Sequence, residues 1–158
     1  MQPSLVAALE LVSLVASGLF SGACMHVTLA EQPARVRLAK TDTKAALLQW
    51  TESFKTAAPV QASLAVVTTA ASTALAINSG DVYPFGIAAG LFGVGTFAYT
   101  LFVLMPTNNK LFAAADKKAD ADDETVRGLI AHWGTLHNVR TVCSLTAFAL
   151  LAHHFVVA

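Results

Sequence analysis

The chain has 158 residues, of which 55% are hydrophobic and 13% are charged, and its formal net charge is zero. Its mean hydropathy is +0.59. Soluble domains of this size are less apolar, so the composition predicts an integral membrane protein, with residues 1–158 forming one domain. A neutral chain without a basic run excludes nucleic acid as a partner.

Four apolar runs are visible in the sequence, at residues 5–30, 59–77, 83–105 and 136–157. Each run is close to the roughly 20 residues that a helix needs to cross about 30 Å of hydrocarbon. The expected fold is therefore all-α, an integral membrane four-helix bundle, and the expected localisation is that of a multi-pass membrane protein.

The basic residues indicate how the chain is threaded. Every lysine and arginine except Arg140 lies between the first two runs or between the last two. The short turn at 78–82 contains Asp81 and no basic residue, and both termini lack lysine and arginine. The positive-inside rule then predicts that both long connectors face the cytoplasm or its organellar equivalent, with the termini and the short turn opposite.

The first connector suggests an extra helix. Glu31 reaches the expected membrane boundary, and Pro33 is expected to stop or kink the first helix. Residues 42–56 are amphipathic and predict an interfacial helix between spans 1 and 2, with Trp50 either in the interfacial belt or over a pocket. Pro59, close to Gln61, suits the first turn of the second span.

The start of the last run carries the most informative polar residues. At about 100° per residue, Trp133, His137 and Arg140 fall on one helical stripe, and His132 lies to its side. The residues that follow are apolar, so Arg140 is expected at membrane depth, where an ionisable residue needs a partner. Glu31 is the carboxylate expected at that depth, so we predict a Glu31–Arg140 pair, with His137 facing into the bundle.

Other segments add candidates and exclude some chemistry. Pro106 is expected to break the third helix, placing Asn108 beside the polar cluster. His26 and Glu31 are five residues apart, as are His132 and His137, and this spacing points the members of each pair to different helix faces. We therefore predict no metal site, the alternative being His137 and Glu31 with a third ligand from another helix. Cys24 and Cys143 are expected to pack, not to form a disulfide.

The sequence also resembles the anthrone oxygenase family of four-span membrane proteins. The resemblance rests on five segments in order, which cover nearly the whole chain: GLFSGA at 18–23, EQPAR at 31–35, Trp50 with Phe54-Lys55 and Gln61-Ala62, MPTNNKL at 105–111, and WGTLHNVR at 133–140. It implies a four-helix membrane bundle. For the fungal polyketide-pathway members, it also implies an oxygenase that converts anthrones to anthraquinones without a known cofactor. The sequence departs from the usual pattern at Gln32, where many relatives have histidine.

Two hypotheses about function follow. In the first, an enzyme without a cofactor acts on a hydrophobic small molecule from the bilayer. His137 is the general base, since the reference pKa of histidine, about 6.5, lies near the working pH. Arg140 and Asn108 stabilise the developing oxyanion beside Glu31. The expected substrate-binding residues are Trp50, Trp133, Gln61 and His26. In the second hypothesis, the chain is a non-catalytic accessory subunit of a larger assembly of membrane subunits.

Overall fold

The computed structural model describes residues 1–79, 83–116 and 121–157, and this part of the chain is helical without any strand. The elements in order are α1 (Pro3–His26), the π-helical η1 (Val27–Glu31), α2 (Gln32–Thr41), α3 (Thr43–Ser79), α4 (Phe85–Phe92), the π-helical η2 (Gly93–Ala98) and η3 (Thr100–Leu104), α5 (Met105–Ala115) and α6 (Asp123–Val157). The all-α prediction is confirmed.

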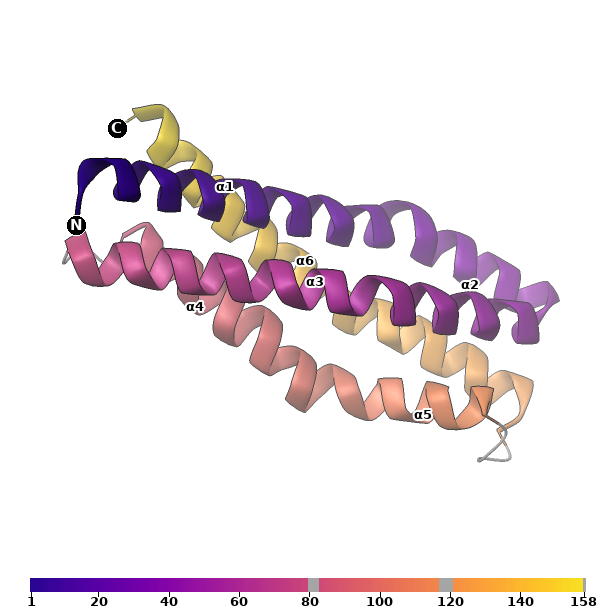
Figure 1. Ribbon diagram of the computed structural model, residues 1–158. Helices are drawn as coiled ribbons and strands as arrows, with labels where there is room; N and C mark the ends of the chain where they lie inside the picture. The colour runs from indigo at the N-terminus through magenta and orange to yellow at the C-terminus, as the bar shows by residue number, and fades with distance from the viewer. Residues whose placement is uncertain (80–82, 117–120, 158) are drawn as a thin grey trace.

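These elements join into four long helices that lie side by side as a bundle (Figure 1). The first span covers Pro3–Thr41, the second Thr43–Asn78, the third Phe85–Ala115 and the fourth Asp123–Val157. All four are long and apolar enough to cross a membrane. The four-helix bundle predicted from the apolar runs is therefore confirmed.

Each span is longer than its apolar run, because two prolines do not end the helices that contain them. Pro33 and Pro106 lie in the first turns of α2 and α5, directly after the π-helical segments η1 and η3. Proline cannot donate the usual helical hydrogen bond, and a local π adjustment re-satisfies the carbonyl groups that this leaves free. The expected helix end at Pro106 is therefore wrong, and at Pro33 the chain stays helical.

The interfacial helix expected at 42–56 is replaced by the first turns of α3, which continues through Pro59. The start of this helix is fixed by Asp42, whose side chain accepts a hydrogen bond from the backbone nitrogen of Ala45 at 2.9 Å. Its apolar face, including Leu47 and Trp50, is buried in the bundle. The prediction of a separate interfacial helix is wrong because this apolar face packs on protein and not on the membrane surface.

Two apolar clusters hold the bundle together. One contains Phe20, Leu75, Phe85, Phe92 and Leu151, and lies toward the chain termini. The other contains Trp50, Leu104, Leu111, Ile130 and Trp133, and lies toward the long connectors. The first two spans also approach each other closely beside the first cluster, where the hydroxyls of Ser13 and Ser72 are 2.6 Å apart.

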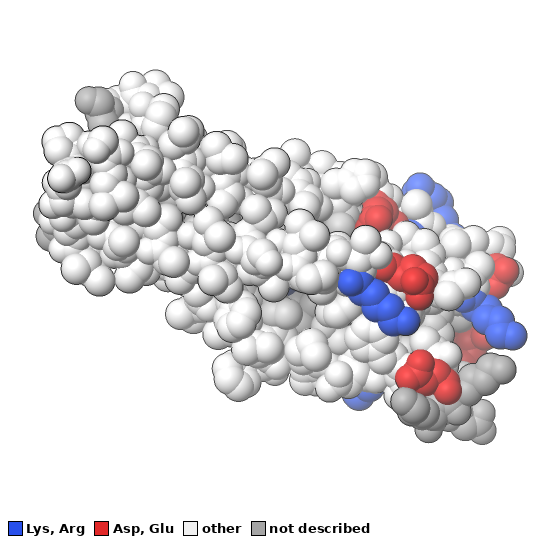
Figure 2. Space-filling view, in the orientation of Figure 1, with Lys and Arg blue, Asp and Glu red and all other residues white. Residues whose placement is uncertain are grey.

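Charged side chains gather at one end of the molecule. In Figure 2 the lysines, arginines and carboxylates lie at the end that holds α2 and α5, and the face shown is uncharged toward the termini. Both termini lie at the opposite end from the two long connectors, as Figure 1 shows. This arrangement matches the predicted threading, although Asp81, Lys117 and Lys118 lie outside the described residues.

Candidate functional site

A cavity of about 180 Å³ lies between the two apolar clusters and is bordered by all four spans. More than half of its lining residues are aromatic or aliphatic, and each of the four spans also contributes polar side chains. The polar or ionisable residues on its lining are Glu31, Arg35, Ser53, Gln61, Thr96, Thr100, His137 and Arg140. An apolar cavity with a few convergent polar groups is the usual form of a small-molecule site.

The predicted stripe on α6 faces this cavity. Trp133, His137 and Arg140 all line it, and His132 is exposed on another face of the helix. His137 is 2% exposed, so the prediction that it faces into the bundle is confirmed. Its ring stacks on the Trp133 indole, with centroids 4.9 Å apart and planes 16° apart. Both imidazole nitrogens are buried, and among the described residues neither has a hydrogen-bond partner.

Arg140 lies one turn further along the same stripe. Its Nη2 donates a hydrogen bond to Oε1 of Gln61 at 3.0 Å, and its guanidinium carbon lies 5.5 Å from the centroid of the Phe20 ring. Its Nε has no partner within the described part of the chain. The guanidinium is therefore held by a neutral amide and an aromatic face, which leaves its charge available to an anionic oxygen.

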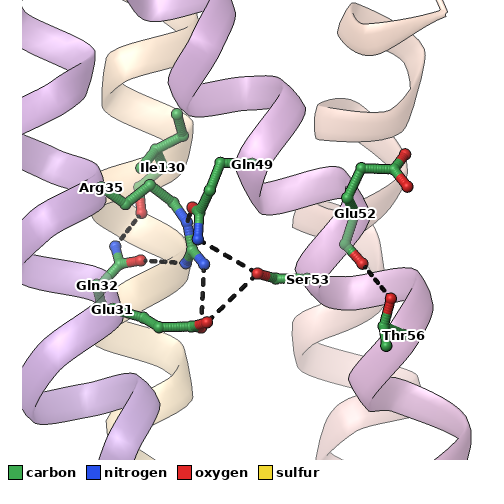
Figure 3. A network of polar contacts seen from close by, with 8 residues as sticks. All are labelled: Glu31, Gln32, Arg35, Gln49, Glu52, Ser53, Thr56 and Ile130. Atoms are coloured by element: carbon green, nitrogen blue, oxygen red, sulfur yellow. Dashed lines mark hydrogen bonds and ion pairs between the residues drawn. The ribbon is translucent and has the colours of Figure 1, made fainter.

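The predicted Glu31–Arg140 pair is wrong, because Glu31 is engaged by Arg35, one turn along its own span. Nη2 of Arg35 lies 3.3 Å from Oε2 of Glu31. Oε1 of the same carboxylate accepts a hydrogen bond from the Ser53 hydroxyl at 3.4 Å. These groups point toward one another from the first two spans in Figure 3.

Arg35 is the main residue that sequence reasoning missed. Its side chain is 1% exposed. Its Nη1 donates to Oε1 of Gln32 at 2.8 Å, and its Nε donates to Oε1 of Gln49. Gln32 in turn donates to the backbone carbonyl of Ile130 at 2.7 Å, which ties the first span to the fourth (Figure 3). Arg35 had been grouped with the basic connector. The signal against that grouping was Glu31 four residues earlier, the spacing of helical ion pairs.

Two tryptophans form the aromatic wall. Trp50 and Trp133 are 1% and 5% exposed, and their ring centroids are 6.0 Å apart in an edge-to-face arrangement at 82°. Nε1 of Trp133 donates to Oδ1 of Asn108 at 2.9 Å. The Trp50 Nε1 lacks a partner in the described chain. The predicted pocket role of Trp50 therefore fits better than a position in an interfacial belt.

Asn108 and His26 do not reach the cavity. Asn108 is buried behind Trp133, because the third helix continues past Pro106 and keeps this side chain directed at α6. The expected direct contact of Asn108 with an oxyanion is therefore wrong. His26 is exposed and lines a separate groove between the first two spans. That groove shares Glu31 and Gln61 with the cavity.

Metal and disulfide chemistry were the other sequence-level questions. Within residues 1–79, 83–116 and 121–157, no group of three or more His, Cys, Asp or Glu side chains is placed to hold a metal ion. Cys24 and Cys143 are free thiols.

Comparisons with known proteins identify the family of the chain. A family model described as anthrone oxygenase matches residues 50–150, which include Trp50, Trp133, His137 and Arg140. The chain is 28% identical over 147 residues to the anthrone oxygenase tpcL of Aspergillus fumigatus, and the match covers 89% of each chain. No solved structure matches the chain significantly. The chain belongs to the anthrone oxygenase family.

Proposed function

We propose that the protein is a membrane-embedded oxygenase that converts an anthrone-like aromatic to the corresponding quinone in this cavity, without a cofactor. One observation carries the proposal: the imidazole of His137, with both nitrogens unpartnered, lies one helical turn from the guanidinium of Arg140, which has no carboxylate partner among the described residues. Both groups lie in an apolar cavity between aromatic walls, where a base and an oxyanion donor act on the same small ligand.

The first step is proton abstraction. His137 takes a proton from the methylene carbon that lies opposite the anthrone carbonyl, and the electron pair moves through the ring to the carbonyl oxygen. The product is an aromatic oxyanion, which Arg140 stabilises through its Nε and its free Nη hydrogens.

The second step uses dioxygen as the oxidant. The electron-rich carbon forms a bond to O₂, and the peroxide takes up the proton held by His137. Removal of the remaining hydrogen from that carbon then breaks the O–O bond and releases water. Overall, CH₂ and O₂ give C=O and H₂O, so the carbon loses four electrons and dioxygen gains four.

The remaining lining residues hold the ligand. Trp50 and Trp133 contribute apolar lining to the cavity, although Trp50 already stacks on Phe54 and Trp133 on His137, so a fused aromatic ring would meet what remains of their surfaces. Gln61 and Ser53 line the cavity, and their side chains would hydrogen-bond to ring hydroxyl groups. Asn108 contributes indirectly, since its hydrogen bond fixes the indole against which His137 stacks.

Oxygen consumption tests the proposal. Purified protein in detergent is supplied with an anthrone, and dioxygen uptake and quinone formation are followed together. We expect His137→Gln to lower turnover by roughly 10²–10⁴-fold, the contribution of a positioned general base. His132→Gln is the matched control, because His132 is exposed on the same helix outside the cavity, and it should keep wild-type turnover.

Two results would contradict this proposal. Wild-type turnover by His137→Gln would exclude the imidazole as the base. A wild-type protein that consumes no oxygen with any anthrone, and that purifies stoichiometrically with a larger membrane complex, would favour the accessory-subunit hypothesis instead.

A further inference from the structure

Between the second and third spans, the cavity is bordered by side chains that are partly exposed at the surface. Phe97 and Leu101 line it from the third span, although their side chains are 44% and 48% exposed. Ala58 and Ala62 line it from α3, and Ala62 is also exposed. These four residues line the cavity and also lie at or near the surface, so they frame a passage between the cavity and the surface. We call this passage the lateral opening and define it by Ala58, Ala62, Phe97 and Leu101.

The backbone explains why the spans separate here. In the described chain no Cα atom of η3 lies within 8 Å of a Cα atom of α3, whereas η2 and α5, which precede and follow η3, both approach α3 that closely. Figure 1 shows the third span diverging from α3 after α4. The separated part of the span is η3, which carries Leu101, and it begins directly after η2, which carries Phe97 and still approaches α3. Both segments are π-helical, and π-bulges are frequent at functional sites. On the facing helix, alanine side chains are too short to fill the gap.

The chemistry of the lateral opening matches the interior of a bilayer. In α3 no charged residue follows Lys55, and in the third span none precedes Lys110. The frame of the opening therefore lies within apolar sequence on both sides. The groove between the first two spans is different, because it is lined by His26, Glu31 and Glu52.

We propose that the lateral opening is the entrance through which a flat apolar ligand passes from the bilayer directly into the cavity. The identity of that ligand as an anthrone-like substrate rests on the proposed function, but the route does not. A fused aromatic ring concentrates in the hydrocarbon phase, and a path through the groove would bring it past two carboxylates and a histidine. The lateral opening leads it past alanine, phenylalanine and leucine only.

The two tryptophans of the chain allow entrance to be measured without turnover. Both line the cavity and both are buried, so contact quenching of tryptophan fluorescence reports arrival of a quencher there. The protein is reconstituted in phosphatidylcholine vesicles and titrated with nitrobenzene, a flat, lipid-soluble quencher that has no acidic methylene. Ala62→Phe places a ring in the lateral opening. Ala70→Phe introduces the same ring at an exposed alanine of the same helix, and Val60→Phe places it in the groove.

We expect Ala62→Phe to lower the quenching constant by roughly threefold or more, because a bulky ring narrows the path of a small ligand to its pocket. Ala70→Phe and Val60→Phe should leave it unchanged. Leu101→Ala widens the same opening and should raise the quenching constant. This second variant keeps the test decisive if Ala62→Phe folds poorly. Equal quenching in wild type, Ala62→Phe and Leu101→Ala would overturn the proposal, as would a loss confined to Val60→Phe. These quenching results do not depend on oxygen consumption. If the protein consumes no oxygen but the variants show the expected quenching, the proposed function is wrong and the proposed entrance stands.

Discussion

Two buried arginines in this protein are satisfied in different ways, and the difference defines the site. Arg35 has a carboxylate and two amide oxygens as partners. Arg140 has one amide oxygen and the face of Phe20. The depth of Glu31 along the bundle suggested Arg140 as its partner. Depth fixes a position along the helix axis but not the direction around it, and the neighbour four residues away on the same helix was closer.

A double-mutant cycle distinguishes these two pairings. We expect Glu31→Gln and Arg35→Gln to be coupled in their effects on the free energy of unfolding by roughly 0.5–3 kcal/mol, because each removes the partner of the other. Glu31→Gln and Arg140→Gln should be additive within a few tenths of a kcal/mol, since these residues share no direct contact. Unfolding of the detergent-solubilised protein by dodecyl sulfate, followed by circular dichroism, measures both cycles. Coupling confined to the second pair would show that the carboxylate belongs to Arg140.

A substitution at Gln61 is expected to change the turnover rate as well as stability. Its Oε1 accepts the hydrogen bond that orients Arg140. Gln61→Glu keeps the shape and gives the guanidinium a carboxylate, which neutralises the charge proposed to stabilise the oxyanion. We expect this variant to fold and to lose roughly 10²–10³-fold in oxygen-consumption rate, as for a removed oxyanion donor. Unchanged turnover would mean that the charge of Arg140 is not used.

Among the elements, α6 packs tightly on the first span at Gly134. A Cβ atom added there would lie 2.5–2.8 Å from three side-chain atoms of Gln32. Gln32 cannot move away without losing its hydrogen bonds to Ile130 and Arg35. Gly134→Ala should therefore lower the free energy of unfolding by roughly 1–3 kcal/mol, the usual cost of overpacking.

Gly128 provides the matched control on the same helix. Nothing lies within 4 Å of a Cβ atom built there, and the residue is exposed. Gly128→Ala should raise the free energy of unfolding by about 0.5–1 kcal/mol, because alanine favours helix over glycine. The same dodecyl sulfate titration compares the two variants. Equal effects of the two substitutions would mean that Gln32 yields freely to the new methyl group.

Sequence patterns predicted the existence of the four spans well and their ends poorly. Apolar runs long enough to cross a bilayer are a strong signal, and all four became helices. Pro33, Pro59 and Pro106 were expected near helix boundaries, yet each lies within a continuous span. Two of them follow π-helical segments, and the hydrogen bonding of such segments leaves no distinct pattern in the sequence.

The candidate site, like the spans, could be predicted from the sequence only in part. The stripe of Trp133, His137 and Arg140 follows from the period of a single helix, so it could be predicted. The partners of these residues depend on how helices face one another, which no single-helix pattern contains. This is why Gln61 was grouped with the site but not assigned to Arg140. It is also why Arg35 was left in the connector.

At the scale of the whole molecule, the untested prediction is which end faces the cytoplasm or its organellar equivalent. Apart from Arg140, which lies at the cavity, the described lysines and arginines of α2, α3, α5 and α6 lie toward the connector end, and the opposite end carries none among the described residues. The positive-inside rule places the connector end in the cytoplasm. Lys44 and Lys110 are exposed at that end, and Asn78 is exposed at the other, so single cysteines at these positions report the two sides.

In a background with Cys24→Ala and Cys143→Ala, a membrane-impermeant maleimide added to intact cells should label Asn78→Cys and spare Lys44→Cys and Lys110→Cys. After the membrane is permeabilised, all three should react, which shows that the unlabelled cysteines are accessible and only on the far side. In an organelle the same reagent is added to sealed vesicles of known orientation. Labelling of Lys44→Cys and Lys110→Cys from opposite sides would be incompatible with a bundle whose two long connectors share one end. Labelling of both from outside would instead keep the bundle and reverse its orientation, in conflict with the charge distribution on which the prediction depends.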